Sequence, residues 1–147
     1  MTSTLRELLK EYDNTKYATD AGSVVHKKLR MIRGLDKISE SNSDIIQKIK
    51  SHPELTLFFT EDSMAEVPIA AKMNGKFVSR RIDRMVVDDQ NKIVHILDYK
   101  TDVDRSSFRS KYVAQVQEYV SIIRKIYPKY RVYGYILWVH DWVLEKL

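Results

Sequence analysis

Hydrophobic residues repeat at helical spacing in the first third of the chain and at strand spacing in the middle. Val25, Leu29 and Ile32 occupy the positions of one buried helix face, and Ser23 is a suitable cap for the helix that they predict. Shorter apolar patterns on either side predict two more helices, the second of which ends at His52-Pro53. The predicted helices are residues 4–12, 23–33 and 43–50.

From about position 56 onward the pattern is that of extended segments separated by short turns. Asn74-Gly75 is the strongest hairpin signal, and Asp89-Gln90-Asn91 is a second short polar break. The predicted extended segments are residues 57–59, 64–72, 76–88 and 92–100. The last three follow one another through tight turns, so they predict an antiparallel meander.

A long helix and a final strand complete the pattern. Residues 107–127 are predicted to be helical, and Pro128 ends that helix. Residues 131–139 are apolar on both faces, which predicts an interior strand, and the residues after it either extend it or add an edge strand. This order of elements predicts an α/β sandwich with a mixed sheet, and a length of 147 residues fits one domain over 1–147.

The geometry of the second hairpin brings two carboxylates and a lysine together. If its turn centres on Gln90 and Asn91, antiparallel pairing places Asp83 opposite Asp98, with Cβ atoms about 5 Å apart on one face. Lys100 lies two residues after Asp98 and faces the same way. Two like charges side by side repel, so the pair predicts a divalent metal site. A register slip of one residue would send one side chain to the other face, and two solvent-facing strand residues are the alternative interpretation.

The amino-acid composition limits which metals the predicted site could bind and which classes of protein are possible. The chain has no cysteine, which excludes disulfides, thiolate zinc sites and cysteine-ligated iron–sulfur clusters. Oxygen and imidazole ligands then favour Mg²⁺, with Mn²⁺ as a substitute. No long apolar run and no signal-peptide core are present, so we expect a soluble, cytoplasmic protein without a membrane partner. A Gly-rich phosphate loop is also absent, which argues against a nucleotide-driven motor.

The net charge of +5 is unevenly distributed. The basic residues between positions 100 and 131 are Lys100, Arg105, Arg109, Lys111, Arg124, Lys125, Lys129 and Arg131. Only Asp102, Asp104 and Glu118 oppose them. This excess follows the predicted metal site directly, where a polyanionic substrate would require it.

Four other residues have two interpretations each. Gln115 and Tyr119 lie one helical turn apart and share a face with Lys111, which predicts either side chains that contact a phosphate or brace the active site, or ordinary surface positions. His26 lies beside the apolar face of its helix, where an isolated histidine is more often packed or exposed than functional. Glu66 precedes a strand, and it would reach a metal through water only if that strand neighbours the strand of the acidic pair.

Five short motifs follow one another over about residues 20–120. They are Gly22-x-x-x-His26, Glu66-Val67-Pro68, Ile82-Asp83-Arg84, Asp98-Tyr99-Lys100-Thr101 and Gln115-x-x-x-Tyr119. Together they resemble the RecB-type nucleases of the PD-(D/E)XK superfamily. The last motif is similar to that of the branch that includes the nuclease domains of RecBCD-like and AddAB-like helicase–nucleases. The branch with an iron–sulfur cysteine cluster is excluded.

The resemblance implies a restriction-endonuclease-like fold, with a mixed central sheet and a three-stranded meander flanked by helices. It also implies a role for each matching residue. The metal ligands would be His26, Asp83, Asp98 and the backbone carbonyl of Tyr99. Lys100 would be the catalytic lysine, Glu66 an auxiliary acidic residue, and Gln115 with Tyr119 would line the DNA-binding side.

We therefore expect a Mg²⁺-dependent deoxyribonuclease, an exonuclease of the DNA repair and recombination type, that hydrolyses phosphodiester bonds. Arg109 and Lys111 in the basic run are expected to contact the DNA backbone without selecting sequence. Two alternatives stay open: a non-catalytic nucleic-acid-binding module of the same fold, and a sequence- or structure-specific endonuclease. Any helicase would be a separate chain or another part of a longer protein.

Overall fold

The computed structural model describes residues 24–25, 27–32 and 43–147. Its elements are α2 (Ser43–Lys50), the 3₁₀ helix η1 (Pro53–Phe59), β1 (Met64–Met73), β2 (Lys76–Asp88), β3 (Ile93–Lys100), α3 (Arg105–Ile126), β4 (Arg131–Trp138) and β5 (Val143–Lys146). Residues 24–25 and 27–30 are also helical. The predicted helix 4–12, the cap at Ser23 and the histidine at position 26 lie outside the described residues.

The strands form one five-stranded mixed sheet in the order β1-β2-β3-β4-β5. The predicted meander is confirmed, since β1, β2 and β3 pair antiparallel. The chain then crosses over through α3, and β4 pairs parallel with β3 before β5 adds an antiparallel edge strand. The first hairpin turns at Asn74 and Gly75, whose φ angles of 51° and 80° are those of a type I′ turn.

The β2–β3 hairpin has the register that its turn predicted. Arg84 pairs with Leu97, and four further pairs follow in step toward the turn, which therefore centres on Gln90 and Asn91. The next pair in this register would join positions 83 and 98, but the ladder stops before it. β3 continues to pair with β4 as far as Lys100, so β2 separates from β3 at position 83.

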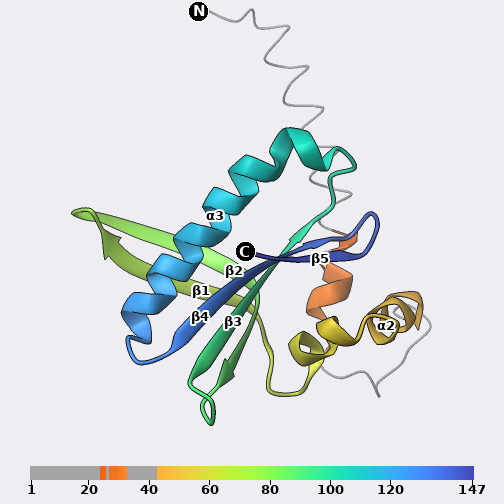
Figure 1. Ribbon diagram of the computed structural model, residues 1–147, viewed down its shortest axis with the longest axis horizontal. Helices are drawn as coiled ribbons and strands as arrows, with labels where there is room; N and C mark the ends of the chain where they lie inside the picture. The colour runs from red at the N-terminus through yellow and green to blue at the C-terminus, as the bar shows by residue number, and fades with distance from the viewer. Residues whose placement is uncertain (1–23, 26, 33–42) are drawn as a thin grey trace, which may run out of the picture.

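Helices lie against both faces of the sheet, as Figure 1 shows. Alternate residues of β3 contact opposite layers, as expected for a strand buried on both sides. One core contains Val94, Ile96, Tyr119 and Ile122, and so lies between the sheet and α3. The other contains Leu97, Tyr99, Ile46, Ile49 and Phe58, and so lies between the sheet and the α2–η1 layer. Polar residues at even positions of β3 consequently face α3.

The predicted extended segment 57–59 is wrong, because these residues belong to η1. Pro53 lies at the start of that helix, and Leu55, Phe58 and Phe59 are its buried residues. Their spacing of three to four residues follows a helical turn rather than the alternation of a strand. A short apolar run cannot be assigned by periodicity alone, and here burial against the α2 layer decided the conformation.

The second half of the chain follows the predicted order closely. α3 begins two residues before the predicted start, where Asp104 accepts a hydrogen bond from the backbone N–H of Ser107 at 3.3 Å. β4 is an interior strand, as predicted. Of the two possibilities for the last residues, the structure shows the second, because β5 is a separate edge strand. Within the part of the chain that the structure describes, no helix combines the length and apolar character needed to cross a membrane.

Candidate active site

Asp83, Asp98 and Lys100 converge on the sheet face that α3 covers. Lys100 Nζ lies 2.9 Å from Asp98 Oδ2, and the charges of both residues act on the Asp83 carboxyl group. The three side chains come from neighbouring strands at the position where β2 leaves β3. The predicted juxtaposition is therefore present, on one face of the sheet.

A backbone hydrogen bond holds the Asp83 carboxylate where the ladder ends. The N–H of Tyr99 donates to Asp83 Oδ2 at 2.8 Å. At the point where the β2–β3 ladder ends, this N–H of β3 is therefore bonded to a side-chain oxygen of β2 and not to a backbone carbonyl. This N–H stabilises the ionised carboxylate, whereas burial and the neighbouring acid oppose ionisation. Asp83 is thus positioned by the sheet itself and not by a flexible loop.

The Asp98 carboxylate is nearly inaccessible to solvent, with 3% of the residue exposed. Its Oδ2 atom is buried, and no hydrogen bond reaches it from the described residues. The contact with Lys100 Nζ is close enough for an ion pair, but its geometry is not that of a hydrogen bond. Buried polar atoms are rarely left in this state, which makes Oδ2 a suitable ligand for a cation.

The acidic pair is electrostatically strained in the absence of a cation. Burial, followed by the charge of Asp98, raises the pKa of the Asp83 carboxyl group to about 8. A hydrogen bond with the Asp98 carboxyl group acts in the same direction, and nearby Lys100 opposes it. Two carboxylates in one buried site are disfavoured unless positive charge joins them, and one ammonium group balances only one of the two.

Lys100 is held by three groups. Besides Asp98, its ammonium donates to Gln115 Oε1 at 2.8 Å and lies 4.2 Å from the centroid of the Tyr112 ring. Tyr112 is fixed in turn by a 2.8 Å hydrogen bond from its hydroxyl group to Asp102 Oδ2. Gln115, which was predicted to contact a phosphate or to brace the active site, contacts Lys100 directly. Tyr112 was not predicted, although its place one helical turn before Gln115 is a signal for it.

Tyr119 lies in the core beside the acidic pair. It is 4% exposed and packs in the core between the sheet and α3. Burial, and then the charges of Asp98 and Asp83, raises the pKa of its phenol to about 12. A side chain so deeply buried braces the site and presents little surface to a substrate.

Glu66 faces Asp83 in the β1–β2 register, but the two are not a ladder pair. Its φ of 55° is left-handed, which is uncommon for glutamate and locally strained. The carboxylate lies 3.5 Å from Arg81 Nη1. Across residues 24–25, 27–32 and 43–147, no group of three or more His, Asp or Glu side chains is arranged to hold a metal ion. The other predicted ligand, His26, lies outside those residues.

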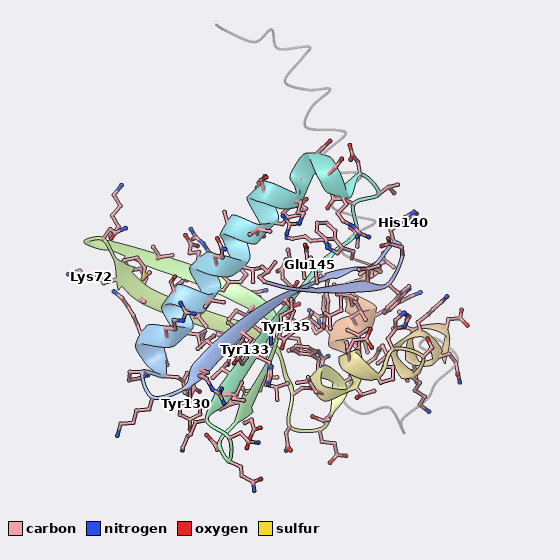
Figure 2. The ribbon with its side chains drawn as sticks, viewed as in Figure 1. Lys72, Tyr130, Tyr133, Tyr135, His140 and Glu145 are labelled. Atoms are coloured by element: carbon pink, nitrogen blue, oxygen red, sulfur yellow. The ribbon has the colours of Figure 1, made fainter. Side chains whose placement is uncertain are left out.

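The basic run of α3 is partly neutralised by the last hairpin. Arg109 Nε lies 2.7 Å from Glu145 Oε1, and Arg105 pairs with Asp141. Figure 2 shows Glu145 on β5, beside α3. Lys111 is exposed, as expected for a phosphate contact. Of the two residues predicted to contact DNA here, Arg109 pairs with Glu145, while Lys111 forms no ion pair with a described residue, so less free positive charge is present than the sequence suggested.

Arg84 is the principal residue that the sequence interpretation missed. It is 1% exposed and lies on the opposite sheet face from its neighbour Asp83, with its guanidinium 4.5 Å from the ring centroid of Phe59. Its hydrogen-bond acceptors are the carbonyl oxygens of Leu29, Arg30, Ile32 and Phe58 and the hydroxyl oxygens of Ser63 and Tyr99. The apolar residues Ile82, Met85 and Val86 around Arg84 were the available signal of a buried charge.

No family model matches the chain, and no curated protein is significantly similar to it.

Proposed function

We propose that this chain is a metal-dependent nuclease that hydrolyses DNA phosphodiester bonds, of the RecB type within the PD-(D/E)XK superfamily. The observation on which the proposal depends is the buried pair Asp83 and Asp98 with Lys100 beside it. The order of the sequence motifs supports the same function, and so does the mixed sheet with its antiparallel meander.

The donor set fits a hard divalent cation such as Mg²⁺. Asp83 and Asp98 would hold it, because both present carboxylate oxygens and Asp98 Oδ2 is buried without a hydrogen bond from the described residues. When bound, the ion would acidify a water molecule and neutralise charge on the phosphate. His26 would complete the ligand set if the resemblance holds.

The protein's own residues orient the site. The Tyr99 N–H fixes one oxygen of Asp83, and Gln115 with the Tyr112 ring fixes the ammonium of Lys100. If a cation were bound to Asp98, Lys100 would still have its contacts with Gln115 and the Tyr112 ring. Its ammonium is then available to orient the attacking water or to stabilise charge on the phosphate.

The test is cleavage of end-labelled linear DNA in Mg²⁺, in Mn²⁺ and in chelator. Asp98→Asn and Lys100→Gln keep the size of each side chain and should each lower the cleavage rate at least about 100-fold, the scale of one lost electrostatic contact to the transition state. Asp44→Asn and Lys50→Gln on α2 are matched controls and should retain the rate of the wild type. Full activity in both site variants would refute the proposal.

Circular substrates separate the two enzymatic possibilities. An exonuclease releases nucleotides from linear DNA and leaves covalently closed circles intact, whereas an endonuclease cuts both. Binding of DNA without cleavage under every metal condition would favour the non-catalytic module.

A further inference from the structure

The β1–β2 hairpin extends well beyond the rest of the sheet. β2 pairs with β1 as far as Lys76, but it pairs with β3 only from Arg84 onward. Residues 67–82 therefore form a two-stranded arm, which projects beside α3 in Figure 1. Figure 2 places Lys72 near its projecting end.

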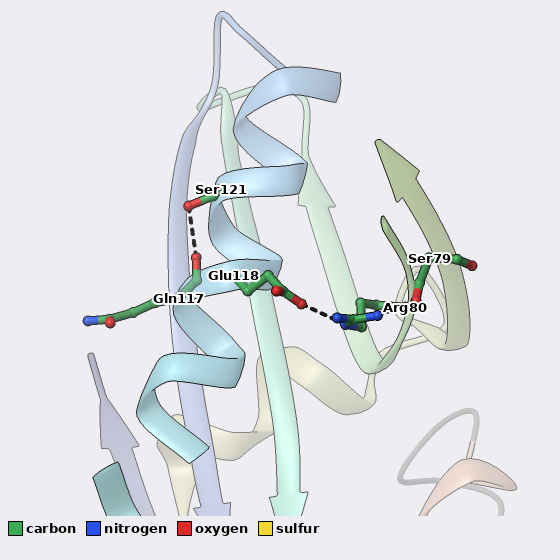
Figure 3. Close-up of polar contacts among 5 residues, drawn as sticks. All are labelled: Ser79, Arg80, Gln117, Glu118 and Ser121. Atoms are coloured by element: carbon green, nitrogen blue, oxygen red, sulfur yellow. Dashed lines mark hydrogen bonds and ion pairs between the residues drawn. The ribbon is translucent and has the colours of Figure 1, made fainter. Parts of the chain in front are cut away.

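α3 supports one face of this arm. Ile69 and Val78 belong to the same core as the α3 residues that face the sheet. Arg80 Nε lies 2.6 Å from Glu118 Oε1 on the helix, as Figure 3 shows, with Ser79 on the far side of the hairpin. The face that carries Ser79 is therefore directed away from α3, and also away from the acidic pair, which lies on the α3 side of the sheet.

The face directed away from α3 is exposed over its whole length. Its cross-strand pairs are Pro68 with Arg81, Ala70 with Ser79, and Lys72 with Phe77. All six residues, which we call the arm face, are exposed, and 75% of the Phe77 surface is accessible to solvent. An aromatic ring with so much accessible surface is a suitable anchor for a partner.

The charge of the arm has one sign. Residues 67–82 contain Lys72, Lys76, Arg80 and Arg81 and no acidic residue. Lys72 forms no ion pair with a described residue, and Arg81 has 68% of its side chain exposed although Glu66 Oε2 lies 3.5 Å from its Nη1. The arm face consequently presents positive charge beside apolar side chains, and it is complementary to a surface that is both acidic and apolar.

The free edge of β1 is poorly suited to the addition of another strand. In a hairpin with a two-residue turn, the residues that flank the turn form a hydrogen-bonded pair, so the backbone groups of Pro68, Ala70 and Lys72 point away from β2. Pro68 has no N–H to donate, and the carbonyl oxygen of Lys72 already accepts a hydrogen bond from Lys125 Nζ at 2.6 Å. A partner is therefore expected to contact the side chains of the arm face and not this edge.

Charge also discriminates between the possible occupants. In a symmetric dimer a second copy of the chain would place the arm face against itself, and the cations would repel. Lys72 lies opposite Phe77, so it is separated from Arg81 by about 13 Å along the hairpin, at roughly 3.3 Å per residue. A nucleic-acid strand carries about four phosphates over that length, at about 3.4 Å per charge, and two cations balance only half of them. A protein segment can instead place its carboxylates at the spacing of the two cations.

We propose that the arm face is a docking surface for an acidic protein segment that covers Phe77 with an apolar side chain. Carboxylates of that segment pair with Lys72 and Arg81 at the two ends of the face. Ala70 and Ser79 lie between the ends and are small, so the backbone of the segment can approach the sheet closely. This docking is independent of the nuclease function, because the arm face and the acidic pair lie on opposite sides of the sheet.

Fluorescence anisotropy with a labelled synthetic peptide tests the proposal. The peptide has glutamates on both sides of a central leucine, and about 12 residues are enough to span the arm face in an extended form. It should bind at low salt, and binding should weaken as salt is added, because solvent screens exposed charge pairs. Matched peptides with glutamine in place of glutamate, or with serine in place of leucine, should bind at least about tenfold more weakly.

Substitutions assign the binding to the arm face. Phe77→Ser should weaken binding of the acidic peptide roughly tenfold, the scale of one aromatic contact at the centre of an interface. Lys72→Gln and Arg81→Gln should each weaken it severalfold and reduce its salt dependence. Phe108→Ser is the matched control for an exposed aromatic residue, and Lys50→Gln is the control for an exposed lysine. Both controls should bind the peptide like the wild type.

Each contrary result overturns the proposal in a distinct way. If the glutamine peptide binds as tightly as the acidic one, or if Phe77→Ser keeps its affinity, the arm face does not dock an acidic segment. If an oligothymidylate in chelator binds more tightly than the peptide and loses affinity in the same variants, the face binds nucleic acid. If sedimentation velocity detects self-association that Phe77→Ser abolishes, the occupant is a second copy of the chain. Asp98→Asn should bind the peptide like the wild type, so failure of the nuclease proposal leaves this test valid.

Discussion

The two faces of the sheet bury charge in opposite ways, although the residues concerned are neighbours in the chain. On the α2–η1 face, Arg84 donates to six oxygens, four from carbonyl groups and two from hydroxyl groups. On the α3 face, Asp98 Oδ2 is buried without any hydrogen bond from the described residues. Both groups are almost fully buried, with 1% and 3% of their surface exposed.

This difference separates a structural charge from a functional one. Arg84 has satisfied its hydrogen-bonding capacity within the protein, and its acceptors include the carbonyl oxygens of Leu29 and Ile32. The hydrogen-bonding capacity of the acidic pair is not satisfied in this way. Its two carboxyl groups repel each other when both are ionised, and a bound cation would relieve that repulsion. The predictions below test this contrast, from the largest expected effect to the smallest.

Loss of the Arg84 guanidinium should give the largest change in stability. Arg84→Met leaves several buried oxygens without a donor and should lower the free energy of unfolding by about 3–5 kcal/mol. Urea denaturation followed by circular dichroism measures the change. Arg81→Met, on the exposed side of the same strand, is the matched control and should change stability by less than about 0.5 kcal/mol. Equal effects in the two variants would contradict a structural role for Arg84.

The metal-free protein should lose stability as pH rises. The raised pKa means that folded Asp83 keeps a proton that the unfolded chain has released, between about pH 4 and its folded value of about 8. The stabilisation is complete below this window and is lost through it, with a slope of up to about 1.4 kcal/mol per pH unit. Asp83→Asn should remove that slope in urea denaturation at several pH values with chelator present. An unchanged slope would show that Asp83 ionises normally.

Added Mg²⁺ should reverse part of this loss. At pH 8, with 10 mM Mg²⁺ and a dissociation constant of about 1 mM, binding to the folded state would add about 1.4 kcal/mol of stability. The measurement is the shift in Tm between chelator and Mg²⁺. Asp98→Asn should abolish the shift, and Asp44→Asn should keep it. A shift of the same size in Asp98→Asn would place the ion elsewhere.

The exposed ion pair between β2 and α3 should have the smallest effect on stability. Arg80→Gln breaks the contact with Glu118, in which both side chains are more than a third exposed, and should lower stability by at most about 1 kcal/mol. Because solvent screens such pairs, 1 M salt should remove the difference from the wild type. A larger, salt-independent loss would mean that Arg80 packs against α3 chiefly through its hydrocarbon stem.

The predictions that succeeded depended on local pattern. The length of the Asp89–Asn91 turn determines the β2–β3 register, so the opposition of Asp83 and Asp98 could be worked out from the sequence. The bounds of α2 and the position of the first hairpin turn were also predicted from residues close together in the chain.

What the sequence did not reveal depends on contacts between distant segments. Arg84 meets acceptors more than 50 residues earlier in the chain, and Arg109 meets Glu145 36 residues later. Contacts between residues so far apart in the chain leave no periodic pattern in the sequence. The conformation of residues 57–59 likewise depended on burial by another layer and not on their own propensity.

The adjacency of Asp83 and Arg84 also guards the strand against misalignment. If β2 slid by one residue, a guanidinium would meet the ammonium of Lys100, and a carboxylate would meet a group of carbonyl oxygens. Both sides of the sheet would then be repulsive at once. These two opposite charges therefore discriminate against the shifted pairing during folding, a safeguard that a strand with neutral residues at the same positions would lack.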